Sequence, residues 1–398
     1  MIGPATLWTE NLRVKGGDMR DVKGLVRVTV FAGLALMTAT SMVRIAVAQE
    51  KGGGDVTGPY DYVSDWPLPV HADGWTWGSI PAVWAESEDR VLVFMRGEKP
   101  AMKAVPAQGD IKGRALGLLE GVLEQGRQQG RLDEHVLMVF NRRGQLIDSW
   151  AQNKDLFTEG AAHRVQIDPY DPDKHVWLVE HLTHQILKFT NDGSKLVMRL
   201  GEKGVPGNDH THFNQPTDML FMPNGDFYVT DGYRNSRVVK FSKEGKYLME
   251  WGKPGSGPGE FHTVHGIAID AKRRIYVGDR ENARIQVFDE NGKFLDQWPN
   301  IPHPYFLYMS EDQHLWVGDG LVHKILKFDL NGNLLYSWGT FGRMPGFLWG
   351  PHQLSVDPAG NLYVANAQGN NVAKFRPKKN ADPAKLVGQP FVLPAERR

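Results

Sequence analysis

The chain has 398 residues, of which 41% are hydrophobic and 12 are tryptophan, so it can bury a large core. Lys and Arg together number 46, as do Asp and Glu, and this balance argues against nucleic acid or an acidic membrane surface as a partner. The absence of cysteine excludes disulfides, thiolate metal ligands and a cysteine nucleophile, so any metal ion must use histidine and oxygen ligands.

Residues 1–48 are predicted to be a signal peptide. Basic residues precede an apolar run at 28–43, and Ala46 and Ala48 follow in the A-x-A pattern of a cleavage site. The run falls short of the ~20 residues that a membrane-spanning helix needs, which favours cleavage over retention as an anchor. We therefore expect an exported protein, periplasmic or secreted, that begins near Gln49 and has no stable membrane association after cleavage.

The region 80–375 contains six copies of a repeat of roughly 40 to 50 residues. Short alternating apolar runs end in an acidic turn, as in HGIAIDAKRRIYVGDRE from His265, and most copies continue with I-x-x-F-x-x-x-G-x-x-L-x-x-W. Alternation with a period of two, broken by Asn-Gly, Asp-Gly or Glu-Gly turns, is typical of strands joined by hairpins. Four strands per copy predict an all-β fold, a six-bladed β-propeller whose blades pack against their neighbours.

Three segments flank or interrupt the repeats. Residues 49–79 are interpreted as a linker; the part near 64–80 or the C-terminal sequence KLVGQPFVL could supply the strand that closes the ring. Residues 98–134 form an insertion in the first blade, where apolar residues on one helical face predict a short helix over one end of the ring. Residues 376–398, rich in proline and charge, are predicted to form a surface tail.

The residue at the head of each innermost strand differs between copies. The six head residues are Pro81, His163, Thr217, His265, Tyr305 and His352. Histidine occupies alternate members of a six-fold ring, so the three imidazoles should converge near the axis, where they would form the ligand set of a zinc ion with an open position. The alternative is that each is a core histidine with one hydrogen bond. Other histidines, among them His181 and His184, lack this symmetry and are predicted to lie at the surface or in loops.

A second group of candidates follows the acidic turn. Arg96 stands there in the first copy and Arg280 in the fourth, and Tyr233 lies one residue further in the third. Because the loops at these strand ends rim the same channel mouth, the two guanidinium groups could clamp a carboxylate. A tyrosine beside two arginines and a divalent cation favours its phenolate form and can serve as a base. The alternative for each residue is a solvated position in a loop.

Residues that recur at matching positions are assigned to the blade and not to the site. Asn235 with Arg237, and Asn282 with Arg284, stand at equivalent places in the third and fourth copies. We expect them to stabilise their blades.

These segments resemble peptidyl-α-hydroxyglycine α-amidating lyase, the NHL-repeat lyase of peptide amidation. The likeness spans about Ile80 to Phe375 and is carried by FNQPTDMLFMPNGDFYVTDGYRNSRVVKFSKEGKYLMEWG, VHGIAIDAKRRIYVGDRENARIQVF, FMRG and GPHQLSVDPAGNLYVANA. It implies a six-bladed β-propeller of NHL-type repeats. The zinc ligands that it implies are His163, His265 and His352. The residues that it implies for action on the substrate are Tyr233, Arg96 and Arg280.

The resemblance also implies a calcium ion in the channel, bound by two backbone carbonyls and an Asp that follows the third histidine. The carbonyl positions match Val83 and Val165, but Gln353 stands in place of the Asp, and its neutral amide oxygen is a weaker ligand for a hard cation. The disulfide cysteines of animal members are also absent, with Arg234 directly after Tyr233.

The implied activity is that of a peptidylamidoglycolate lyase, which cleaves the C–N bond of an N-acyl or peptidyl α-hydroxyglycine to an amide and glyoxylate. The substrate would be a small molecule or peptide with a C-terminal α-hydroxyglycine, supplied by a separate hydroxylating enzyme, or a related carbinolamide. Two other classes are a propeller hydrolase such as a lactonase, which normally relies on a carboxylate-rich calcium site, and a non-enzymatic NHL scaffold, which predicts no stoichiometric zinc.

Overall fold

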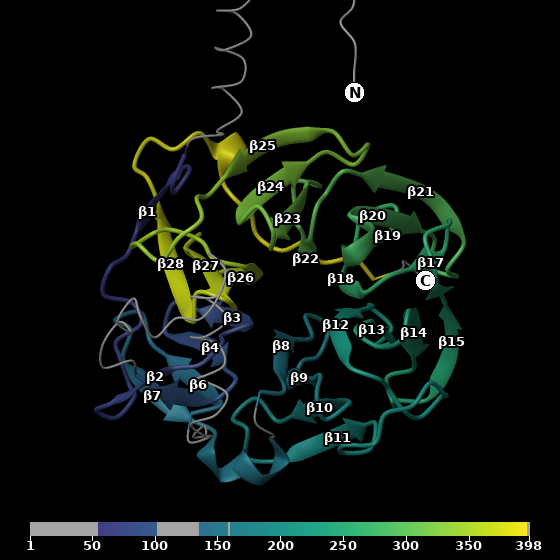
Figure 1. Ribbon diagram of the computed structural model, residues 1–398, viewed down its shortest axis with the longest axis horizontal. Coiled ribbons are helices and arrows are strands. Elements are labelled where there is room, and N and C mark those ends of the chain that lie inside the picture. The colour runs from purple at the N-terminus through teal and green to yellow at the C-terminus, as the bar shows by residue number, and fades with distance from the viewer. Residues whose placement is uncertain (1–54, 102–134, 158–159, 396–398) are drawn as a thin grey trace, which may run out of the picture. The chain divides into compact units, whose positions relative to one another are not determined.

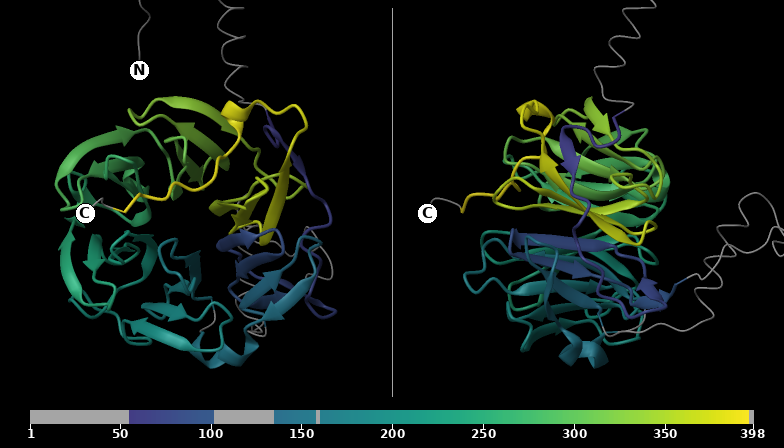
Figure 2. Two further views of the ribbon diagram at one scale, coloured as in Figure 1. Left: turned by 180° about the vertical axis from the view of Figure 1, so that it is seen from behind. Right: turned by 90° about the vertical axis from the view of Figure 1, so that its left-hand side faces the viewer.

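In the computed structural model, which describes residues 55–101, 135–157 and 160–395, six four-stranded antiparallel sheets are arranged in a ring around a central axis (Figure 1). We call the space along this axis, where two cavities are lined by residues of the inner strands, the channel. Each sheet is one blade, and its first strand lies innermost, beside the channel (Figures 1 and 2). The all-β fold and the six-bladed β-propeller are therefore confirmed. No helix among the described residues is long and apolar enough to cross a membrane.

The strands of the blades run as follows, from the channel outward. Blade 1 contains β3 (Ala82–Ser87), β4 (Arg90–Phe94), β6 (Leu137–Phe140) and β7 (Leu146–Ser149). Blade 2 contains β8 (Ala162–Ile167), β9 (Val176–Glu180), β10 (Gln185–Phe189) and β11 (Leu196–Leu200). Blade 3 contains β12 (Pro216–Phe221), β13 (Phe227–Asp231), β14 (Arg237–Phe241) and β15 (Tyr247–Trp251).

The second half of the ring repeats this order. Blade 4 contains β18 (Val264–Ile269), β19 (Ile275–Asp279), β20 (Arg284–Phe288) and β21 (Phe294–Pro299). Blade 5 contains β22 (Pro304–Met309), β23 (Leu315–Asp319), β24 (Lys324–Phe328) and β25 (Leu334–Trp338). Blade 6 contains β26 (Pro351–Val356), β27 (Leu362–Asn366), β28 (Asn371–Pro377) and, as its outermost strand, β1 (Tyr60–Tyr62).

The remaining elements are short. Two-stranded sheets join β2 (Trp75–Trp77) to β5 (Glu98–Pro100) and β16 (Lys253–Pro254) to β17 (Glu260–Phe261). The part of the chain that the structure describes also contains the 3-10 turns η2 (Ala151–Leu156), η3 (Arg280–Asn282) and η4 (Pro383–Lys385).

The core lies between the blades. Among the described residues, each of six clusters of buried hydrophobic side chains draws mainly on two neighbouring blades. The Gly and Trp of the repeat meet at these boundaries: a Cβ added to Gly292 of blade 4 would lie 2.6 Å from the ring of Trp251 in blade 3, and the φ of Gly292 is +76°. Glycine is therefore required on both counts at that turn.

The ring closes with β1, which pairs antiparallel with β28 between Tyr60↔Pro377 and Tyr62↔Phe375. The closing strand thus lies within the predicted 49–79 segment, but upstream of the part near 64–80, which was one of the two candidates. That part contributes β2, which pairs with β5 at the start of the insertion. Three residues are too few to show alternation, which is why the position of the closing strand was not evident.

The segment after β28 packs against the propeller. Val387 and Leu393 are buried, and the backbone N–H of Phe391 donates to the carbonyl of Met309 at 2.8 Å. Figure 2 shows this segment crossing the face opposite to the one seen in Figure 1. The expectation of a surface tail at 376–398 was therefore wrong for these residues, because their apolar side chains cover the far end of the channel.

Two predicted features lie outside the described residues. These are the signal peptide at 1–48 and the short helix of the insertion, whose apolar face falls within 102–134.

Candidate metal centre and active site

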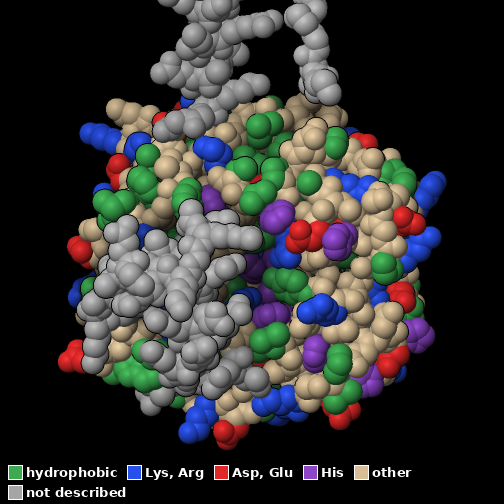
Figure 3. All heavy atoms as spheres, in the orientation of Figure 1, with side chains coloured by type: hydrophobic (Ala, Val, Ile, Leu, Met, Phe, Trp, Pro, Cys, Tyr) green, Lys and Arg blue, Asp and Glu red, His purple; other side chains and the backbone are tan. Residues whose placement is uncertain are grey.

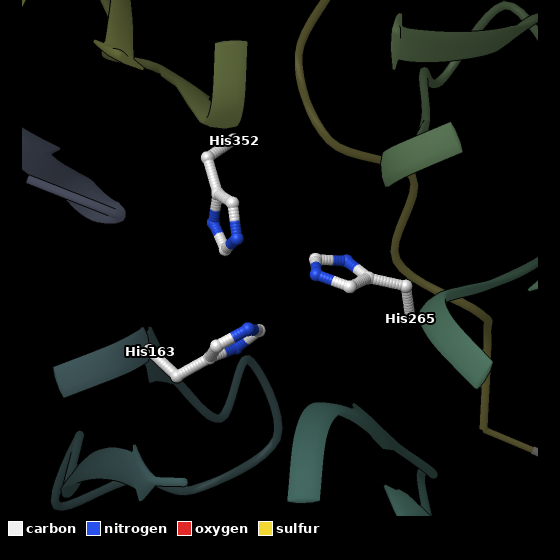
Figure 4. A group of neighbouring side chains, drawn as sticks. All are labelled: His163, His265 and His352. Atoms are coloured by element: carbon white, nitrogen blue, oxygen red, sulfur yellow. The ribbon is translucent and has the colours of Figure 1, made fainter. Parts of the chain in front are cut away.

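Three histidines meet in the channel near the end where the inner strands begin, which we call the mouth. His163 on β8, His265 on β18 and His352 on β26 are each at most 3% exposed. One ring nitrogen from each can be chosen such that all lie within 4.8 Å of one another, and Figure 4 shows the three rings pointing toward a common centre. Histidine side chains are visible inside the mouth in the space-filling view of Figure 3.

A shift of strand register lies at each of these positions. The pairing of β8 with β9 is irregular between Ala162 and Arg164, and the inner strands of blades 4 and 6 show the same irregularity at their histidines. A β-bulge bends the strand and re-aims a side chain, and such bulges are common beside active sites. The bulges therefore turn the head residues of the strands toward the axis.

The orientation of each imidazole is fixed by the next blade. Each Nδ1 lies within hydrogen-bond distance of a backbone carbonyl. The pairs are His163 with Thr217 at 2.6 Å, His265 with Tyr305 at 2.5 Å, and His352 with Pro81 at 2.9 Å. A carbonyl only accepts, so Nδ1 carries the proton and donates, which leaves the lone pair of Nε2 free for a cation. This is the outer-sphere arrangement of metal-binding histidines.

The electrostatics favour neutral rings. Burial lowers the pKa of all three imidazoles well below the ordinary value of 6.5. Neighbouring charge lowers it further, from His352 on His163 and His265, and from Arg164 on His352. Neutral imidazole is the form that binds a metal ion, so the residues present fit a first-row cation such as zinc.

Tyr233 stands directly above this cluster. Its hydroxyl lies 3.1 Å from Nε2 of His163 and 3.1 Å from Nε2 of His265. The preceding Gly232 permits this position, because a Cβ there would lie 1.6 Å from the carbonyl oxygen of Val264. The phenol therefore lies where it can exchange a proton with a group bound to the imidazoles.

The two predicted arginines flank the tyrosine. The guanidinium of Arg280, in η3, lies 5.1 Å from the ring centre of Tyr233 and forms an ion pair with Glu281 at 2.7 Å. Arg96, after β4, donates from Nε to the carbonyl of Ala162 at 2.9 Å. The structure thus brings all six predicted zinc and substrate residues to one place. A cavity of about 110 Å³ at this mouth is lined by Ser79, Arg96, Tyr233, Tyr305, His352, Ala367 and Gln368.

Comparison with known proteins shows which families and proteins this chain resembles. A family model described as a 6-bladed beta-propeller matches residues 208–297. Peptidyl-glycine alpha-amidating monooxygenase B of Xenopus laevis is 30% identical over 277 residues, 64% of this chain and 30% of that protein. Peptidyl-alpha-hydroxyglycine alpha-amidating lyase 1 of Drosophila melanogaster is 28% identical over 254 residues, 61% of this chain and 42% of that protein.

The chain is thus similar in sequence to part of proteins whose names include peptide-amidating enzymes and an amidating lyase. It spans less than half the length of either relative. A solved structure described provisionally as a gluconolactonase has 11% identity and a TM-score of 0.50, covering 79% of this chain and 97% of its own, and it shows the shared fold alone.

Two further residues lie beside the histidine cluster although sequence reasoning did not select them. His181 was expected at the surface but is buried, with its ring 5.3 Å from that of His163 and 5.5 Å from that of Tyr233. Its neighbour His184 is also buried, and both lie in the turn between β9 and β10, so they are loop residues as expected but are not exposed at the surface. The signal that could have found His181 is its position directly after the acidic residue Glu180 at the end of the second strand.

Tyr305 is the second addition to the site. Besides its carbonyl bond to His265, its ring stacks 5.2 Å from that imidazole, and Gln368 donates to its hydroxyl at 3.1 Å. It stands near the start of β22, the fifth inner strand, where the alternation of histidines gave no signal for a tyrosine.

The implied calcium ligands do not fit in this chain. The side-chain amide of Gln353 donates from Nε2 to the carbonyl of Val165 at 2.8 Å. Two of the three expected calcium ligands are therefore hydrogen-bonded to each other. The Gln353 side chain thus presents an N–H where the family pattern has a carboxylate oxygen. The third position, Val83, lies fully buried on β3.

Proposed function

We propose that this chain is a zinc-dependent lyase that cleaves the C–N bond of an N-acyl or peptidyl α-hydroxyglycine, releasing an amide and glyoxylate. The observation that carries the proposal is the hydroxyl of Tyr233 placed 3.1 Å from the Nε2 atoms of two of the three converging histidines. The relatives whose names contain this activity support it.

Zinc bound by His163, His265 and His352 would supply Lewis acidity to the α-hydroxyl of the substrate. Tyr233 would then take the hydroxyl proton as the C–N bond breaks, and the electron pair of that bond would pass to the amide nitrogen. The nitrogen gains a proton and leaves as the amide, while the carbon becomes the aldehyde of glyoxylate, so atoms and charge balance. No redox partner is needed.

The arginines would bind the carboxylate. Arg280 is close enough to contact both Tyr233 and Tyr305, since its guanidinium lies 5.1 Å and 5.4 Å from their ring centres. Arg96 lines the same cavity as Tyr233 and His352. A carboxylate held there would place the α-carbon beside the tyrosine hydroxyl. Charge-assisted hydrogen bonds from arginine to a carboxylate are stronger than neutral ones, above all where water is excluded.

The test is glyoxylate release from N-benzoyl-α-hydroxyglycine by protein purified from Gln49 onward, with metal content measured on the same sample. Release that a chelator abolishes and added zinc restores is the expected result. Stoichiometric zinc without release would mean that the site acts on another carbinolamide or a lactone. A folded protein that retains no zinc would contradict the proposal and favour a binding scaffold.

Tyr233→Phe isolates the base. We expect turnover to fall by ~10²–10⁴, the usual contribution of an acid–base group, with metal content unchanged because the imidazoles are held by backbone carbonyls. Tyr247→Phe, in β15 of the same blade, is the matched control. Turnover that survives in Tyr233→Phe would remove this residue from the mechanism.

A further inference from the structure

A buried arginine lies beneath the three histidines. Arg164 follows His163 on β8, and only 1% of it is exposed. Its guanidinium donates from one terminal nitrogen to the carbonyl of His352 at 3.0 Å and from the other to Oδ2 of Asp218 at 2.8 Å. One cation therefore connects the inner strands of blades 2, 3 and 6, and it reaches the backbone of one of the histidines directly.

The carboxylate of Asp218 is fully occupied. Oδ2 accepts from Arg164 and, at 3.4 Å, from the backbone N–H of Ile267. Oδ1 accepts from the amide of Gln166 at 2.7 Å and from the backbone N–H of Met219 at 2.8 Å. A carboxylate offers about four lone-pair positions, so four donors leave none for a metal ion.

The cavity below this layer has no further negative charge. It has a volume of about 170 Å³, is mainly apolar, and is covered at the far end by the C-terminal segment at Phe391. Among the described residues that line it, Asp218 is the only carboxylate and Arg164 the only cation, so their charges cancel. A calcium site needs six to eight oxygen ligands with carboxylates among them, and this cavity does not supply them.

We propose that the Arg164 guanidinium is the structural cation of this channel, so that the propeller folds without calcium and Arg164 acts as a positioning residue for the histidine cluster. Its positive charge is covalently part of the chain and compensates Asp218, the role that a bound divalent ion would otherwise have. The link to zinc retention rests on the proposed function, whereas the independence from calcium does not.

The loss of one partner of a buried ion pair leaves the other charge without compensation, which is strongly destabilising. Removing the guanidinium also frees the carbonyl of His352, whose strand then has one fewer restraint. Second-sphere partners of metal ligands typically change metal affinity by 10–100-fold when mutated. Arg164 should therefore affect both thermal stability and zinc retention.

The first experiment compares the Tm of the purified holoprotein, dialysed into calcium-free buffer, without and with ~1 mM added calcium, at the same zinc content. A site with a Kd of about 10 μM would raise Tm by a few degrees under this condition. We expect the wild-type Tm to be the same in both. A calcium-dependent rise in wild-type Tm would overturn the proposal.

The second experiment uses substitutions. Arg164→Gln should lower Tm by roughly 5–10 °C and weaken zinc retention about 10-fold in a chelator competition. Arg142→Gln, which removes an exposed arginine paired with Asp89, is the matched control and should change neither. If Arg164→Gln retained wild-type Tm and zinc affinity, the assignment would be wrong. Arg164→Lys keeps the positive charge and replaces Arg164→Gln if that variant does not fold. Its Tm and zinc affinity should fall less than those of Arg164→Gln.

A gain of calcium binding gives the sharpest test. In Arg164→Ala/Gln353→Asp, the carboxylates at 218 and 353 line the same cavity and the guanidinium is gone, so we expect calcium to raise the Tm of this variant although it does not affect the wild type. These readouts do not depend on catalysis. A protein that behaves in this way but releases no glyoxylate would contradict only the proposed function, and a double variant that ignores calcium would contradict the cation assignment.

Discussion

At the scale of single residues, the candidate site depends on hydrogen bonds that fix each imidazole before any ion binds. The Nδ1 of His352 is held by the carbonyl of Pro81 at 2.9 Å, and Arg164 holds the carbonyl of the same histidine. Both contacts come from other blades. The imidazole of His352 is therefore preorganised, because its side chain loses conformational entropy during folding and not on metal binding.

Removal of one ligand should abolish metal retention. His352→Ala leaves two imidazoles, and we expect zinc stoichiometry and turnover to fall to background while the circular dichroism of the β-sheets persists. His314→Ala, whose side chain pairs with Asp312 on blade 5, is the control and should retain both. Normal zinc content in His352→Ala would show that the ion, if present, binds elsewhere.

Arg280 allows the recognition of the carboxylate to be separated from the chemistry. Loss of a charge-assisted hydrogen bond costs about 1.5–3 kcal/mol, so Arg280→Met should raise KM by roughly 10–100-fold. The same change should have little effect on the carboxamide analogue of the substrate, which carries no charge. If both substrates were affected equally, Arg280 would act by positioning Tyr233, whose ring it covers.

At the scale of the element, blades 2 to 5 each have a buried acid at the end of the second strand. In blade 4 the carboxylate of Asp279 accepts from Arg284 at 2.7 Å and from Asn282 at 2.8 Å, as the matching positions in two copies predicted. Arg284 also donates to the carbonyls of Ser256 and Gly257 in the loop that precedes the blade. The pair therefore orders the loop as well as the blade.

This network gives a stability prediction. Arg284→Met leaves the fully buried Asp279 without its cation, and the free energy of unfolding should fall by about 3–5 kcal/mol, measured by urea denaturation. Lys293→Met, at an exposed position of the same blade, should change it by less than about 0.5 kcal/mol. Equal effects of the two substitutions would show that the network contributes nothing beyond surface charge.

The repeat pattern was sufficient to predict the blades and the alternate placement of His163, His265 and His352, because strand periodicity and a six-fold ring determine which positions face the axis. It could not predict the bulges. Strict alternation places His163 and Arg164 on opposite faces of β8, whereas the register shift between Ala162 and Arg164 lets both reach the channel. The repeat pattern therefore gave no reason to select Arg164, although it is among the most buried of the described residues.

At the scale of the whole molecule, the site exists only while the ring is closed, because its ligands come from blades 2, 4 and 6. Closure depends on β1, where Tyr60 packs against Trp338 at 5.7 Å and Phe375 at 6.3 Å between ring centres. The hydroxyl of Tyr60 also accepts from the backbone N–H of Val387 at 2.7 Å, which ties the C-terminal segment to the same strand. Both ends of the described chain thus meet at one tyrosine.

Tyr60→Ala should therefore weaken closure and the site together. A large buried aromatic side chain typically contributes about 3–5 kcal/mol, so we expect a marked fall in Tm. We also expect faster zinc loss to a chelator, because opening between blades 5 and 6 releases the blade that carries His352. Asp61→Ala, at the exposed neighbour in β1, is the control, since its side chain points away from the blade. A Tyr60→Ala protein with lowered Tm but wild-type zinc loss would mean that the channel is held by the inner strands alone, through contacts such as that of Arg164.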